Sequence, residues 1–198
     1  MHMKNNPKKP GQFKRPFIQT HLSRTWFLSK GCKQVPLEYS KNIVRWGHPG
    51  GYFLKPDGQK ATDNFSPAAQ RAMHDRNTKM GKGYPILREC AECCHRLMAL
   101  AFYGSRPTYK DKNGKTYVGI CHHLIPDALD YKPANLLCWL TREQHTEADR
   151  RQKELKKVLP DMHDLSYDEH RRLQDPRTMS REQFDVELNQ LRQHYGKA

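Results

Sequence analysis

Apolar residues are sparse at the start of the chain and more regular after it. Residues 1–16 carry five Lys and Arg among three Pro, so we expect a disordered basic arm. From 17 to 53 aromatic and basic residues interleave. Such aromatics either stack on nucleic-acid bases or pack together, and packing is the favoured interpretation. Flanking turn residues predict a short strand at 51–55.

Helical periodicity and helix-start residues predict the helices. Ser66 before Pro67 starts one that runs to about 79, and apolar spacing predicts another over 85–103. Capping boxes start three more at Thr141, Ser166 and Ser180; the first reaches about 158 and the last ends at 196. The helices that begin at Ser166 and Ser180 are interpreted as packing elements without chemistry.

A hairpin is predicted before the Thr141 helix. Asn113-Gly114, the pair favoured in type I′ turns, separates strands at 108–112 and 115–121. The second strand delivers His122 and His123 at its end, and a polar loop over 127–133 follows. The fold class is therefore α+β.

Three potential metal ligands converge in this arrangement. His145 and Asp149 are four residues apart and share one face of the predicted helix. With His122 at the strand end they offer two nitrogens and one carboxylate, a set suited to a divalent metal with open positions. His123 points to the other strand face unless the strand end bends, and a neutral imidazole there could accept a proton.

The six cysteines have two interpretations. Cys90-x-x-Cys93 has zinc-knuckle spacing, but it lacks a Gly, and Cys121 and Cys138 are solitary. A cysteine-lined helix face is favoured over structural zinc, because reduced Cys packs as a small hydrophobe. The alternative is a zinc-stabilised, non-catalytic nucleic-acid-binding module with Cys90, Cys93, Cys121 and Cys138 or nearby His as ligands.

Net charge points to a polyanionic partner. The chain carries +14, of which +10 lies in residues 1–60, where twelve Lys and Arg face two acids. A basic block of this kind commonly contacts nucleic acid, although it can also be a solvated tail. No apolar run is long enough to span a membrane and no signal peptide is evident, so a cytoplasmic location with reduced cysteines is expected.

The segments HHLIP, ANLL and LTREQH together resemble the HNH (ββα-metal) endonuclease family over about residues 109–157. The resemblance implies a hairpin and a helix that clamp one metal ion. It gives His122 and His145 the role of metal ligands, His123 that of the general base, and Asn135 that of the motif Asn. Asp149 stands where colicin-type members place a further His. Two features depart from the family pattern: Asn135 precedes His145 by ten residues instead of nine, and the paired zinc cysteines after the Asn are absent.

The function expected from this resemblance is metal-dependent hydrolysis of phosphodiester bonds, most simply in double-stranded DNA, in a bacterial or phage-infected cell. One Mg²⁺, Mn²⁺ or Zn²⁺ ion is expected, and structural zinc is not. The candidate nucleic-acid contacts are Lys14, Arg15, Arg142, Arg150 and Arg151. The expected divisions are a basic arm (1–16), a basic and aromatic region (17–85), the nuclease core (86–160) and C-terminal helices (161–198). The sequence leaves open DNA against RNA, nicking against double-strand cutting, and the identity of the metal.

Overall fold

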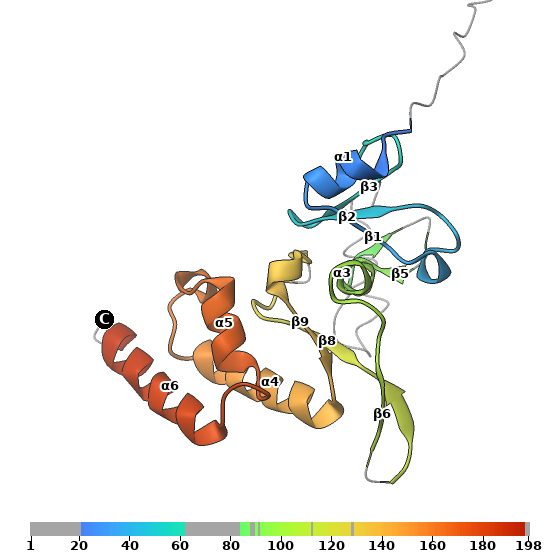
Figure 1. Cartoon of the computed structure of the whole chain (residues 1–198). Coiled ribbons are helices and arrows are strands. Elements are labelled where there is room, and N and C mark those ends of the chain that lie inside the picture. Colours follow the sequence, from blue (N-terminus) through green and yellow to red (C-terminus); the bar gives the residue numbers. More distant parts are fainter. Residues whose placement is uncertain are drawn as a thin grey trace, which may run out of the picture.

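A computed structural model of the chain describes residues 21–61, 84–87, 90, 92–111, 113–127 and 129–196. In these residues the fold is mixed α+β, with small antiparallel sheets and five helices (Figure 1). The helices are α1 (Arg24–Ser29), α3 (Cys94–Tyr103), α4 (Arg142–Leu155), α5 (Tyr167–Gln174) and α6 (Arg181–Tyr195). The predicted arm at 1–16 and the helix expected from Ser66 lie outside the described residues.

The first sheet contains three short antiparallel strands, β1 (Lys33–Gln34), β2 (Trp46–His48) and β3 (Tyr52–Leu54). The strand expected at 51–55 is confirmed by β3. Phe27 of α1 is buried and stacks on Trp46 of β2 with ring centroids 4.6 Å apart. The aromatic residues of this region therefore pack together, as the favoured interpretation predicted.

The helix predicted over 85–103 is only half correct. Its first half is a hairpin of β4 (Ile86–Leu87) and β5 (Glu92–Cys93), with Cys90 in the turn, and α3 begins at Cys94. Leu87 and Cys90 are buried in the same cluster as the apolar residues of α3. Because a tight hairpin buries the same side chains as a helical turn, apolar spacing did not distinguish the two structures.

The hairpin of β6 (Thr108–Lys110) and β7 (Thr116–Val118) is confirmed, but its turn is not centred on Asn113-Gly114. Gly114 N–H donates to the carbonyl of Asp111 at 2.9 Å, so the turn spans 111–114 and Gly114 closes it with φ of +75°. The Asp111 carboxylate accepts hydrogen bonds from the Asn113 and Lys115 amides. This side-chain bond from the first turn residue explains the one-residue shift from the predicted type I′ turn.

The two histidines lie on a separate strand, β8 (Ile120–His123), which pairs with β9 (Leu136–Leu140) instead of extending the first hairpin. The break falls at Gly119, where a Cβ would lie 3.0 Å from the Trp139 Cα, so the backbones approach too closely for another residue type. Helix α4 follows β9 directly, and the ββ-hairpin next to it is therefore β8–β9 (Figure 1). The sequence prediction had assigned that place to β6–β7.

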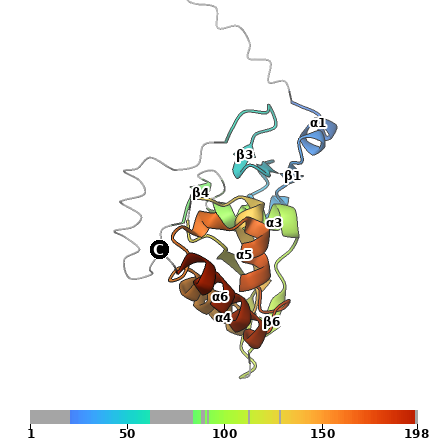
Figure 2. The ribbon, with the colours of Figure 1, turned by 90° about the vertical axis from the view of Figure 1, so that its left-hand side faces the viewer.

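The C-terminal helices pack on α4. Helices α4, α5 and α6 lie next to one another (Figure 2). Their side chains share one apolar cluster that includes Leu155, Leu173, Phe184 and Leu188. The capping boxes at Thr141, Ser166 and Ser180 are all present. Helix α4 ends at Leu155, slightly before the predicted 158. None of the helices in the described part of the chain is long and apolar enough to cross a membrane.

Candidate metal centre and active site

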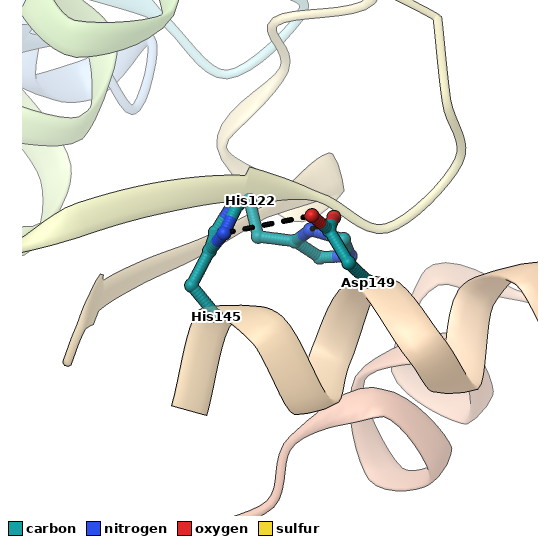
Figure 3. A group of neighbouring side chains, drawn as sticks. All are labelled: His122, His145 and Asp149. Atoms are coloured by element: carbon teal, nitrogen blue, oxygen red, sulfur yellow. Dashed lines mark ion pairs between the residues drawn. The ribbon is translucent and has the colours of Figure 1, made fainter. Parts of the chain in front are cut away.

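His122, His145 and Asp149 meet between β8 and α4 (Figure 3). One ligand atom from each residue lies within 4.8 Å of the others. His122 Nδ1 is 3.1 Å from Asp149 Oδ1, and His145 Nδ1 is 3.6 Å from Asp149 Oδ2. Within this group the His122 side chain is buried, whereas the side chains of His145 and Asp149 are 28% and 41% exposed. The group therefore has a closed side on the strand and an open side towards solvent.

The other ring nitrogen of His122 contacts α5. His122 Nε2 lies 3.0 Å from Gln174 Oε1, and both residues are buried. The Gln174 amide nitrogen is already occupied by the Leu124 carbonyl and by His170 Nδ1, each at 2.9 Å. Gln174 can therefore only accept from His122, which favours a proton on Nε2. The Gln152 amide nitrogen lies 3.3 Å from the same Nε2, but its two hydrogens bond to the His123 and Leu124 carbonyls, so it does not compete for this nitrogen.

His170 completes this chain of hydrogen bonds. Its Nε2 donates to the Met162 carbonyl at 2.6 Å, so Nδ1 is free to accept from Gln174. Burial lowers the pKa of His170, which favours the neutral ring that this pattern requires. We expected the C-terminal helices only to pack; α5 does pack, and its His170 and Gln174 also form a buried hydrogen-bond chain that ends at His122. The missed signal is the spacing of His170 and Gln174, which places two buried polar residues on one helix face.

The donor set fits a divalent cation. His122 Nδ1 and Asp149 Oδ1 lie 3.1 Å apart, a separation that either a shared proton or a shared cation can bridge. Ligands about 2.1 Å from one ion lie roughly 3.0–3.5 Å apart at tetrahedral or octahedral angles. The two separations to Asp149 are 3.1 and 3.6 Å, the third pair of ligand atoms lies within 4.8 Å, and two imidazoles with one carboxylate suit a divalent metal with open positions.

Gln152 and Asn135 hold the backbone that carries the histidines. Gln152, one turn after Asp149 on α4, donates to the carbonyls of His123 and Leu124. Asn135 is fully buried, accepts from the Ile125 amide at 2.7 Å and donates to the carbonyls of Ile125 and Asp130. These bonds close the loop between β8 and β9. Asn135 therefore orders the loop and is not part of the three-residue group, and sequence reasoning missed Gln152 altogether.

His123 lies on the opposite side of β8 from His122, as strand alternation predicted. Its ring stacks on Tyr84 with centroids 5.5 Å apart and meets the edge of His95 of α3 at 5.2 Å. Burial, together with the nearby His123, Arg96 and Arg106, lowers the pKa of His95 to about 3. The expected general base is thus held between two rings, and the ring beside it from α3 is neutral at physiological pH.

The five candidate nucleic-acid contacts have different surroundings. Arg142 is exposed at the start of α4, with its guanidinium 5.2 Å from the Tyr117 ring centroid. Arg150 is exposed and pairs with Glu147. Arg151 is 2% exposed and bonds to Glu147 and to the carbonyls of Leu173 and Met179, so its assignment as a phosphate contact is wrong. Lys14 and Arg15 lie outside the described residues.

The cysteines do not lie on one helix face. Cys90 and Cys93 belong to the β4–β5 hairpin, and Cys121 and Cys138 meet across β8 and β9 with their Sγ atoms 3.2 Å apart. Burial and the neighbouring Cys121 raise the pKa of Cys138, which favours the thiol. Within the described ranges, no third Cys, His or carboxylate joins this pair as a group of ligands.

Comparison of the chain with protein-family models, curated proteins and solved structures finds no match. A function can therefore be inferred only from the residues and geometry of the site.

Proposed function

We propose that this chain is a metal-dependent endonuclease of the HNH type that hydrolyses phosphodiester bonds, most simply in double-stranded DNA. The observation that carries the proposal is the convergence of His122, His145 and Asp149 between a strand and a capped helix, with His123 next to His122. The order of these residues in the chain and the ββα arrangement of β8, β9 and α4 support it further.

Each residue of the site has a separate role in the proposed reaction. His122, His145 and Asp149 would hold a divalent ion, which when bound neutralises charge on the phosphoryl group and the leaving 3′ oxygen. His123 would accept the proton of the attacking water once its ring leaves Tyr84 and His95 and turns to the side of β8 that carries His122. Gln174 keeps the Nδ1 lone pair of His122 directed at the metal position, and Asn135 keeps the β8–β9 loop closed.

The test is cleavage of supercoiled plasmid DNA with Mg²⁺, Mn²⁺ or Zn²⁺, with a structured RNA assayed in parallel. His123→Ala should reduce the cleavage rate about 10²–10⁴-fold, because it removes the proton acceptor. The same variant should bind Mn²⁺ with unchanged affinity in calorimetry, whereas His145→Ala and Asp149→Ala should lose metal affinity and cleavage together.

His163→Ala is the matched control, because His163 is exposed and lies outside the metal centre. It should cleave and bind metal like the unchanged protein. Full cleavage by His123→Ala, or cleavage that persists in EDTA, would refute the proposal.

The sequence also left open a zinc-stabilised binding module without catalysis. That function would require Cys90 and Cys93 to join Cys121 and Cys138 around one ion. One zinc per chain, lost on Cys121→Ser but not on His145→Ala, together with no cleavage of DNA or RNA, would favour this second function.

A further inference from the structure

A cavity of about 350 Å³ begins at the metal centre and extends away from it towards α3. His145 lines one end, and the walls come from α3, the segment before β6, β7, β8, β9 and the start of α4. Tyr84 and His95, which pack on His123, line it as well. The cavity therefore lies beside both a metal ligand and the surroundings of the expected base.

The charge of its walls has one sign. Arg96, Arg106 and Arg142 line the cavity, and none of its described lining residues is Asp or Glu. Arg96 pairs with Glu92 one turn away, but both side chains are partly exposed, so this ion pair is weak and can exchange for another anion. Three guanidinium groups that line one cavity create a positive potential that attracts anions.

Two buried nitrogen atoms in these walls lack a partner among the described residues. Arg106 Nε and His95 Nδ1 are both buried without a hydrogen bond, and His95 is only 5% exposed. Among the described residues, the other hydrogen bond of Arg106 is a long contact of 3.4 Å from Nη2 to the Gly119 carbonyl. Leaving such groups unsatisfied costs about 1–3 kcal/mol each, and more when the group is charged. An acceptor oxygen of a ligand would satisfy Arg106 Nε after a side-chain movement that uncovers it, and would satisfy His95 Nδ1 in the tautomer that carries the proton on this nitrogen.

The remaining walls suit a nucleotide. Tyr117 and Trp139 offer aromatic surface, on which a sugar or base can pack. Guanidinium groups match phosphate oxygens in geometry as well as in charge. The cavity volume lies at the small end of ligand pockets, which fits one nucleotide of a single strand better than a duplex.

We propose that this cavity binds the phosphodiester next to the one being cut, on the same nucleic-acid strand, through Arg96, Arg106 and Arg142. The inference rests on the proposed function, because the metal centre at His145 then fixes the position of the scissile phosphate. Arg106 is the central contact, because it is the most enclosed of the three and no described carboxylate pairs with it. His95 supplies a neutral hydrogen-bonding group next to it.

The test measures binding separately from cleavage. A fluorescein-labelled 20-nucleotide single strand and its duplex are titrated with protein in EDTA, and fluorescence anisotropy gives Kd at several salt concentrations. Arg106→Ala and Arg142→Ala should each raise Kd for the single strand about tenfold, the effect of losing a charged hydrogen bond. Each should also reduce the slope of log Kd against log salt by about 0.7, the value for one phosphate contact on a single strand.

Two further variants make the result specific. Arg192→Ala, an exposed arginine on α6, is the matched control and should leave Kd and the salt slope nearly unchanged. Arg106→Lys should keep the salt slope while raising Kd, because it retains the charge but not the planar fork. It also serves as the folded replacement if Arg106→Ala does not fold.

The inference is overturned if the Arg106 and Arg142 variants bind like the unchanged protein, or if Arg192→Ala weakens binding as much as they do. These outcomes are distinct from failure of the proposed function. A chain that binds the strand through the cavity arginines but never cleaves would retain the binding site and lose the nuclease assignment. A chain that cleaves normally with all three arginines replaced would retain the nuclease assignment and lose the binding site.

Discussion

His122 connects two parts of the chain through its two ring nitrogens. Nδ1 faces Asp149 on α4, and Nε2 donates to Gln174 on α5, which in turn donates to His170. Partners of this kind fix the tautomer of a metal-ligating histidine and raise its basicity as a ligand. At the scale of single residues, we therefore expect the metal affinity of the candidate site to depend on an amide 52 positions away in the sequence.

Replacing Gln174 by Ala should weaken Mn²⁺ binding about 10–100-fold, the usual effect of removing such a partner. Calorimetric titration of the folded variant measures this directly. Gln193→Ala, an exposed glutamine on α6, is the control and should bind Mn²⁺ normally. If Gln174→Ala binds Mn²⁺ like the unchanged protein, then the hydrogen bond does not orient His122 for a metal.

At the scale of elements, structure that depends on neighbouring residues was predicted well, and pairings between distant segments were not. The capping box at Thr141 involves neighbours in sequence, so the start of α4 and the spacing of His145 and Asp149 could be predicted. Strand β9 was missed because Leu136–Leu140 is almost fully buried and lacks the alternation of a half-exposed strand. The pairing of β9 with β8 joins two segments separated by a loop, and no local sequence pattern specifies it. The contact of His122 with Gln174 was missed for the same reason.

Arg151 joins α4 to the segment that links α5 and α6. Its guanidinium bonds to Glu147 and to the carbonyls of Leu173 and Met179 in a buried position. Arg151→Ala should lower the free energy of unfolding by about 2–4 kcal/mol, because the carbonyls and Glu147 lose a buried partner. Urea denaturation gives the value.

Arg150→Ala is the comparison for that measurement. Arg150 is adjacent in sequence but exposed, and its replacement should change stability by no more than about 0.5 kcal/mol. Equal effects of the two substitutions would contradict the structural role of Arg151. If Arg151→Ala has normal stability but binds DNA more weakly, then Arg151 is a phosphate contact and not a structural residue.

At the scale of the whole molecule, His95 makes stability depend on pH. Its pKa is about 3 in the folded protein, against 6.5 for an ordinary histidine. Between these values the unfolded chain binds more protons than the folded one, so stability rises with pH across this window. The contribution is complete above about pH 6.5 and is lost as the pH falls towards 3. Burial shifts the pKa of His170 in the same direction.

His95→Phe should therefore flatten the curve of unfolding free energy against pH between about 4 and 6, by up to about 1.4 kcal/mol per pH unit. Urea denaturation at a series of pH values measures the slope, which is independent of any uniform loss of stability caused by the substitution. His194→Gln, at an exposed position on α6, should leave the slope unchanged. An unaltered slope in His95→Phe would show that His95 is not buried as a neutral ring.

The hydrogen bond from His122 to Gln174 also limits how this protein can be rearranged by recombination or engineering. The segment from β8 through β9 to α4 contains all three metal-ligand candidates, which suggests that it could be transferred to another protein on its own. The residue that sets the orientation of its buried ligand arrives later in the chain, on α5. A graft that ends at Leu155 would contain the three candidate ligands but not Gln174, the hydrogen-bond partner that orients the His122 ring. The smallest transferable unit therefore extends through Gln174.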